Sequence, residues 1–106
     1  KINSYNHTQA VIIRDNKVIS RETRKGTKEM IKSISKSKTK KGILIKLPKV
    51  KQDLRVDLPT IGIDTFKDCY KVGVKGIVIK SNQNIILNKE ICIKYANQKK
   101  LFLIAI

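Results

Sequence analysis

The 106-residue chain is poor in aromatic residues: it has no Trp, two Phe and three Tyr. This leaves little material for a base-stacking platform or an aromatic-lined ligand cavity. No apolar run approaches the roughly 18 residues that cross a bilayer, and the first residues lack the apolar core of a secretory signal peptide. We therefore expect neither a membrane span nor a secretory leader. Because the chain begins with Lys1 rather than Met, we expect it to be a fragment or a trimmed product.

Cysteine and histidine are also scarce. Cys69 and Cys92 form no C-x-x-C motif and fall on apolar positions of predicted helices, so we expect buried, reduced thiols rather than a metal or redox pair. His7 is the only histidine, so a Ser-His-Asp or Cys-His site would have to be built on it. No nucleophile-elbow motif accompanies it, and we expect His7 in a loop or at a strand edge.

Acidic residues are few, and the imbalance of charge is large. Lys and Arg number 24 against 8 Asp and Glu, for a net charge of +16. Such a charge attracts nucleic acid, anionic lipid headgroups or phosphorylated substrates. The chain is also rich in Ile and Asn throughout, so Lys can be simply its default solubilising residue. The densest run, residues 36–41, falls where a helix should end and complements the helix dipole, which favours a solvated surface over a dedicated nucleic-acid patch.

The first half of the chain predicts a hairpin, a helix and a buried strand. Residues 9–14 and 17–21 are typical of two strands joined by a turn at Asp15-Asn16. Thr27 is a suitable N-cap for a helix with apolar residues at helical spacing behind it. Residues 42–47 form a short apolar run bounded by Gly and Pro, which is typical of a buried strand.

The second half repeats this order. Asp64 is expected to cap a short helix that Gly73 closes, and strands are predicted at residues 76–80 and 85–87. Asn88 is expected to cap a further helix, and residues 101–106 to form a last buried strand.

The predicted order is therefore ββαβ-α-ββαβ within a single domain over residues 1–106. This predicts an α/β fold, a mixed sheet with packed helices. The two halves resemble each other in order, which suggests an internal duplication as a hypothesis.

Residues 48–62 form the one long irregular stretch, and such stretches are often functional. The stretch follows the end of a buried strand, where ligands gather in open α/β sheets. Asp53 and Asp57 flank Arg55 there. Paired carboxylates suit Mg²⁺, cations offset the charge of a phosphoryl group, and a carboxylate can activate water. From spacing alone, a structural role is slightly favoured, with Asp57 bonding the turn at Pro59-Thr60.

Residues 46–62, KLPKVKQDLRVDLPTIG, closely resemble the signature of the C-terminal domain of the UDP-2,3-diacylglucosamine pyrophosphatase family, the LpxI type. Weaker matches at residues 9–12, 26–27, 76–77 and 101–105 extend the resemblance over nearly the whole chain. Glu22 matches a family Glu. The sequence departs from the family at Lys25 and Lys28, where acidic residues usually flank the Gly-Thr pair.

The resemblance implies an activity and its requirements. Such enzymes hydrolyse the diphosphate of UDP-2,3-diacylglucosamine to 2,3-diacylglucosamine 1-phosphate and UMP in lipid A biosynthesis. They attack the phosphorus nearer the sugar and use Mg²⁺ or a similar divalent cation. Their active site lies between this domain and an N-terminal domain that is missing here, so we expect the isolated domain to have little activity.

The resemblance also implies roles for particular residues. Asp53 and Asp57 are expected to bind metal or activate water, without a choice between them. The expected substrate-binding residues are Lys46, Lys49, Gln52 and Arg55, with Thr27, Thr60 and Gly62 in second rank. Thr27 serves equally well as a mere N-cap, and Gly62 as a turn residue.

The implied setting is the cytoplasm, with peripheral contact between a basic or amphipathic face and the anionic inner membrane. The sequence leaves the oligomeric state open, self-association included. Two other functions also stay open: a small basic nucleic-acid-binding module, and a non-catalytic lipid- or protein-binding domain in which Asp53 and Asp57 are structural. The lack of aromatic platforms and of a recognition-helix pattern counts against nucleic acid.

Overall fold

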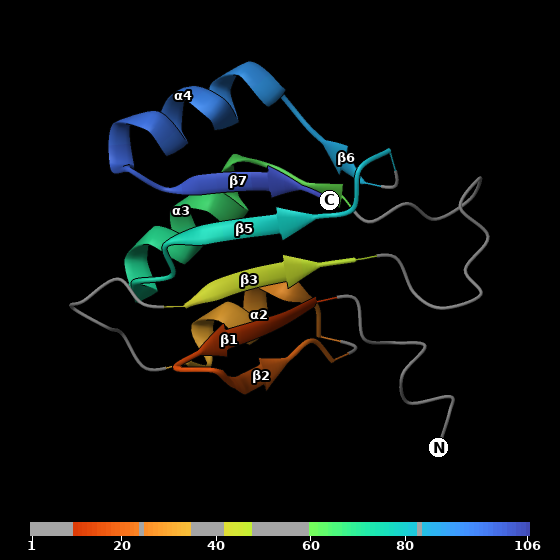
Figure 1. Cartoon of the computed structure of the whole chain (residues 1–106), viewed down its shortest axis with the longest axis vertical. Coiled ribbons are helices and arrows are strands. Elements are labelled where there is room, and N and C mark those ends of the chain that lie inside the picture. Colours follow the sequence, from red (N-terminus) through yellow and green to blue (C-terminus); the bar gives the residue numbers. More distant parts are fainter. Residues whose placement is uncertain (1–9, 24, 35–41, 48–59, 83) are drawn as a thin grey trace.

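A five-stranded mixed sheet with helices on one face forms the body of the protein (Figure 1). The computed structural model describes residues 10–23, 25–34, 42–47, 60–82 and 84–106. The strand order is β2-β1-β3-β5-β7. The predicted α/β class, a mixed sheet with packed helices, is confirmed.

The hairpin at one side of the sheet forms as predicted. Strands β1 (Ala10–Arg14) and β2 (Lys17–Arg21) pair antiparallel, and β1 pairs antiparallel with β3 (Ile43–Lys46) on its other side. The two turn residues, Asp15 and Asn16, have φ angles of 54° and 64°. Asp and Asn tolerate this left-handed region, and the turn it produces matches the twist of the flanking strands.

The other strands of the sheet are parallel. Strand β5 (Gly76–Ile79) pairs with β3 on one side and with β7 (Phe102–Ala105) on the other. The carboxyl ends of β3, β5 and β7 therefore lie at one edge of the sheet. The prediction of a last buried strand is wrong for part of β7, where Ile104 is 46% exposed. Ile104 pairs in register with Val78 on the face that no described helix covers, and β7 is an edge strand.

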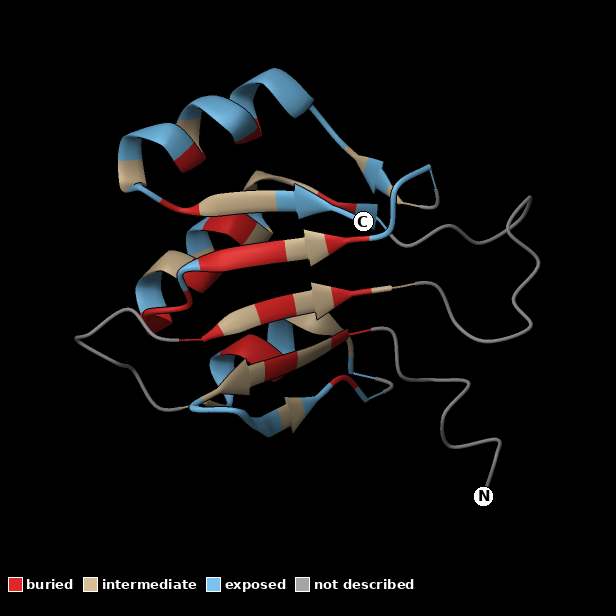
Figure 2. Cartoon of the chain, in the orientation of Figure 1, coloured by how far each residue is buried: buried red, intermediate tan, exposed pale blue. Residues whose placement is uncertain are grey.

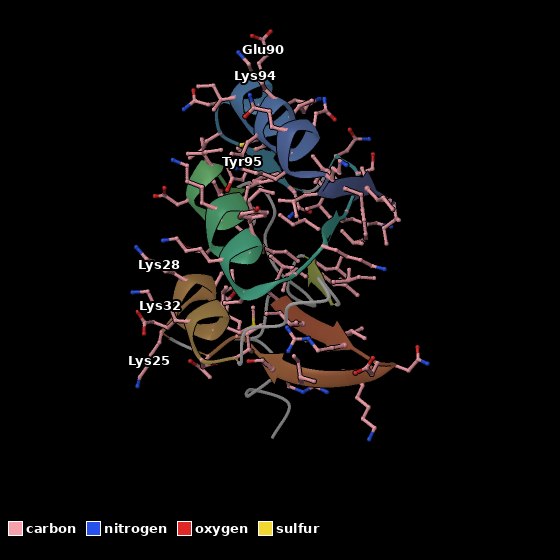
Figure 3. The ribbon with its side chains drawn as sticks, turned by 90° about the vertical axis from the view of Figure 1, so that its left-hand side faces the viewer. Lys25, Lys28, Lys32, Glu90, Lys94 and Tyr95 are labelled. Atoms are coloured by element: carbon pink, nitrogen blue, oxygen red, sulfur yellow. The ribbon has the colours of Figure 1, made fainter. Side chains whose placement is uncertain are left out.

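Three helices pack against the described sheet: α2 (Thr27–Lys32), α3 (Ile63–Val72) and α4 (Lys89–Lys99). In Figure 1, α2 and α3 lie behind the strands and α4 lies beyond the β7 edge. The side view in Figure 3 shows the three helices in a row, with α3 between α2 and α4.

Two of the predicted helix caps are wrong. The N-cap of α2 is Gly26 rather than Thr27, and the Thr27 hydroxyl is used in a tertiary contact instead. Gly62 is the N-cap of α3, so Asp64 lies inside the first turn, where its charge still favours the positive end of the helix.

The two other predicted helix boundaries are confirmed. Gly73 ends α3 with a φ of 86°, a conformation that glycine adopts without strain. Asn88 is the N-cap of α4, although its side chain makes no capping hydrogen bond.

A small second sheet was not predicted. It consists of β4 (Thr60–Ile61) and β6 (Ile85–Ile86), which pair in parallel. In the first half of the chain β1 and β2 form a hairpin, whereas β6 pairs with β4 rather than with β5. The similarity of the two halves thus extends to the order of their elements but not to strand pairing.

The core lies between the sheet and the helices (Figure 2). Ile12, Leu44 and Ile77 are register neighbours on three adjacent strands, and none of them is exposed. Alternation along the strands turns the neighbouring residues, such as Ile45 and Val78, toward the opposite face, which none of the three described helices covers.

Both cysteines belong to this core. Cys69 and Cys92 are buried and free, which confirms the prediction of buried, reduced thiols. Burial raises the pKa of the Cys69 thiol to about 12 and also raises the pKa of Cys92. Neither thiol is therefore activated as a nucleophile.

Gly76 makes room for an aromatic ring on the uncovered face of the sheet. It is the register partner of Phe102, and a Cβ at position 76 would lie 2.2 Å from the tip of the Phe102 ring.

We expect Gly76→Ala to displace the Phe102 ring and to lower the free energy of unfolding by about 1 kcal/mol. Urea denaturation measures the loss. In a Phe102→Ala background the same substitution should have little effect, and an equal loss in both backgrounds would contradict the proposed contact.

Candidate functional site at the carboxyl edge of the sheet

Polar groups from four segments meet where the parallel strands end: three side chains and one backbone carbonyl. Lys46 is the last residue of β3, and Thr60 is the first of β4. Glu22 directly follows β2, with its backbone N–H bonded to the Ala10 carbonyl at 2.8 Å, and Thr27 begins α2. The carboxyl edge of an α/β sheet is where ligands usually bind.

The Lys46 side chain is at the centre of this group. Only 7% of the residue is exposed. Its Nζ donates to the Thr27 hydroxyl and to the Thr60 carbonyl, both at 3.0 Å. The Thr27 hydroxyl in turn donates to Oε1 of Glu22, which is 8% exposed. We call Glu22, Thr27, Lys46 and Thr60 the lysine cluster.

Two opposing effects set the protonation of Lys46. Burial lowers the pKa of its ammonium from 10.5, because water no longer solvates the charge, and the nearby Glu22 carboxylate raises it in partial compensation. A second anion beside Lys46 would act in the same direction as Glu22. The ammonium is therefore a group whose charge an anionic ligand would stabilise.

Asn84 joins the lysine cluster to a neighbouring depression. Its side-chain amide donates to the Lys46 carbonyl at 3.3 Å and accepts from the Lys80 backbone N–H at 2.8 Å. It thus ties the end of β3 to the end of β5. The depression has a volume of about 390 Å³, and Lys80 and Lys89 contribute two cations to its wall.

Four of the nine residues expected at the site fall in the described part of the chain. Lys46, Thr27 and Thr60 are in contact through the hydrogen bonds given above, and Gly62 lies just beyond as the N-cap of α3. The other five lie outside the described residues: Lys49, Gln52, Asp53, Arg55 and Asp57. The roles of all nine stay predictions.

Two residues of the site were not predicted to belong to it. Glu22 was noted only as a family match, because nothing in the local sequence indicates that a carboxylate after a polar strand is buried. Asn84 was predicted only as part of a turn, and its contact with Lys46 spans 38 positions of sequence. Its one signal was its place in the connection between β5 and β6, which leaves the carboxyl end of a parallel strand.

The described residues do not themselves offer a metal site. Within residues 10–23, 25–34, 42–47, 60–82 and 84–106, no group of three or more His, Cys, Asp or Glu side chains could hold a metal ion. The predicted ligands, Asp53 and Asp57, lie outside these ranges. Metal binding therefore stays a prediction.

Exposed lysines among the described residues also lie on the helical side of the protein. Lys25, Lys28 and Lys32 project outward at α2, and Lys94 lies beside Glu90 on α4 (Figure 3). Near α4, the Lys99 ammonium lies 5.0 Å from the centre of the Tyr70 ring. None of the described helices has the length and hydropathy of a membrane-spanning segment.

The fold and the lysine cluster define a class: an α/β domain with a buried ammonium at the carboxyl edge of a mixed sheet. The profile of the LpxI C-terminal domain family matches residues 1–104, and the chain belongs to that family. This confirms the resemblance identified from residues 46–62.

The similarity to a curated protein is consistent with this family. UDP-2,3-diacylglucosamine pyrophosphatase LpxI of Caulobacter vibrioides is 28% identical over 106 residues, which cover 92% of this chain and 38% of the relative. The chain thus spans well under half of that protein's length. The family is described as a C-terminal domain, in agreement with this partial coverage.

The buried ammonium predicts a particular dependence of stability on pH. Because the folded protein lowers the pKa of Lys46, the unfolded chain binds more protons between this lowered value and 10.5. The contribution of Lys46 to the free energy of unfolding should therefore increase as pH rises through that window. Urea denaturation of wild type and Lys46→Met at neutral and alkaline pH measures it.

The matched control is Lys67→Met, which removes an exposed ammonium from α3. Its effect on stability is expected to be small at every pH tested. A difference between wild type and Lys46→Met that stays constant from neutral to alkaline pH would contradict the burial of the ammonium.

Proposed function

We propose that this chain is the C-terminal domain of a divalent-metal-dependent hydrolase that cleaves the diphosphate of UDP-2,3-diacylglucosamine. The products are 2,3-diacylglucosamine 1-phosphate and UMP. One observation carries the proposal: Lys46 Nζ donates to the Thr60 carbonyl at 3.0 Å. This hydrogen bond holds together the two ends of the segment that resembles the family signature, at the carboxyl edge of the sheet. Its donor is a buried ammonium.

The electrostatics of this position suit a diphosphate. An ammonium withdrawn from water attracts an anion more strongly than an exposed one, because the surrounding dielectric is lower. Thr27 and Thr60 hold Lys46 from two sides, so its position is set before substrate arrives. In the proposal, Lys46 binds an oxygen of the diphosphate and stabilises the charge that develops there during hydrolysis.

The remaining roles belong to the residues between Lys46 and Thr60. We assign metal binding or water activation to Asp53 and Asp57, and contacts with the diphosphate to Lys49, Gln52 and Arg55. Carboxylate oxygens are the ligands that Mg²⁺ prefers, and when bound the ion neutralises phosphate charge. A carboxylate that accepts a proton from water makes that water a better nucleophile.

The domain supplies one part of a larger site in this proposal. The depression beside Asn84 continues the basic surface away from Lys46 and offers room for more of the substrate. The N-terminal domain would complete the cleft, so we expect the isolated chain to have little activity. The two acyl chains of the substrate favour work at the inner face of an anionic membrane, which the excess of positive charge would attract.

Substitution of the two carboxylates in the full-length enzyme tests the proposal. We expect Asp53→Asn and Asp57→Asn each to lower kcat by at least about 10³-fold, because the isosteric amide neither binds Mg²⁺ well nor accepts a proton. Lys46→Met should lower kcat/KM by roughly 10²-fold through loss of one charged donor. Release of UMP measures turnover, and a chelator should abolish it until Mg²⁺ is restored.

The control is Asp64→Asn, which changes an exposed carboxylate in the first turn of α3. Its turnover should equal that of wild type, and circular dichroism should show that all variants are folded. Turnover near the wild-type rate in both Asp53→Asn and Asp57→Asn would remove the assignment of the site.

A further inference from the structure

The hydrogen bonds of the lysine cluster run in one direction. An ammonium has only donors, so the Thr27 hydroxyl must accept from Lys46 Nζ, at 3.0 Å. The single hydroxyl proton of Thr27 is then donated to Oε1 of Glu22. Lys46 and Glu22 are thus connected through Thr27, and each bond strengthens the other by polarisation.

Glu22 and Thr27 are five positions apart, whereas Lys46 lies 19 positions beyond Thr27, so the fold brings Lys46 to the other two. Glu22 follows β2, Thr27 begins α2 and Lys46 ends β3. Glu22 and Lys46 are both more than nine-tenths buried. Because a buried polar group without a partner is destabilising, Glu22 and Thr27 restrict the Lys46 side chain to the one position in which all three are satisfied.

Within the described part of the chain, the Lys46 ammonium has one proton left for a further acceptor. Two of its three protons are directed at the Thr27 hydroxyl and the Thr60 carbonyl. Among the described residues, no acceptor is recorded for the third. The hydroxyl proton of Thr27, in contrast, is already donated to Glu22, so the Thr27 side chain has no donor left for a ligand.

We infer that Glu22 is a positioning residue that acts through the Thr27 hydroxyl to fix the Lys46 ammonium for an oxygen of a diphosphate. This assignment rests on the proposed function of Lys46. Glu22 does not touch the substrate, and Thr27 is a relay rather than a direct contact of the substrate. Among the described residues, Glu22 is the acidic group whose charge supports the protonated form of Lys46.

If Glu22 acts only through its charge, its removal changes the affinity for an anion in the opposite direction from that expected if Glu22 positions Lys46. Removal of a carboxylate near an anion site should strengthen anion binding if only net charge matters. If Glu22 holds Lys46 in place, removal of Glu22 should weaken anion binding. The Lys46 ammonium is then no longer fixed, and its charged form is less stable. The sign of the change therefore separates the two roles.

The experiment uses the 106-residue chain with inorganic pyrophosphate as the probe. Calorimetry gives the affinity, and NMR of the Lys46 side chain gives its titration with and without pyrophosphate. We expect Glu22→Met and Thr27→Val each to weaken binding roughly tenfold, as for loss of a hydrogen bond to a charged group. In Glu22→Met the Lys46 titration should also move to lower pH.

Conservative variants keep the relay. Thr27→Ser retains the hydroxyl, and Glu22→Gln retains an acceptor for it, so both should bind within about twofold of wild type. Glu29→Met, which removes an exposed carboxylate from α2, is the charge control and should not weaken binding. If Glu22→Met does not fold, Thr27→Val and Thr27→Ser decide the question alone.

The outcomes are distinguishable. If Lys46→Met loses pyrophosphate binding while folded Glu22→Met or Thr27→Val binds as wild type does, the positioning role is overturned and the proposed function survives. If wild type fails to bind pyrophosphate, or Lys46→Met binds it equally well, the proposed role of Lys46 falls and this inference falls with it.

Discussion

The burial of one ammonium group organises the carboxyl edge of this protein. A charged lysine withdrawn from water is costly unless its protons find acceptors and an opposite charge lies nearby. Lys46 meets both conditions with a hydroxyl, a backbone carbonyl and the Glu22 carboxylate beyond the hydroxyl. The segments that carry Glu22, Thr27 and Thr60 must therefore lie together at the end of β3, and this requirement sets the structure of the edge.

Several departures from local sequence rules follow from this constraint. Thr27 has the chemistry of an N-cap, but its hydroxyl serves Lys46 and Glu22, and Gly26 takes the cap position. Thr60 lies in a strand of only two residues, whose partner β6 is far away in sequence. In both cases a tertiary contact outweighs a local preference, as is expected near functional sites.

The sequence predicted the elements of the fold better than the contacts between them. Alternation and turn residues identified β1, β2 and the turn at Asp15-Asn16, because these signals are local. Strand β4 was missed because two residues carry no periodicity. The candidate site was found through the resemblance at residues 46–62 and not through spacing. The burial of Glu22 and the bridge made by Asn84 depend on long-range packing, which a single sequence does not reveal.

The central claim is that Lys46 receives an oxygen of a diphosphate at this edge. The most direct test is a crystal structure of the full-length enzyme with a non-hydrolysable UDP-sugar analogue and Mg²⁺. The account predicts a phosphoryl oxygen within hydrogen-bond distance, roughly 3 Å, of Lys46 Nζ, with the bonds to Thr27 and Thr60 intact. A diphosphate bound elsewhere, with Lys46 still buried and unliganded, would contradict it.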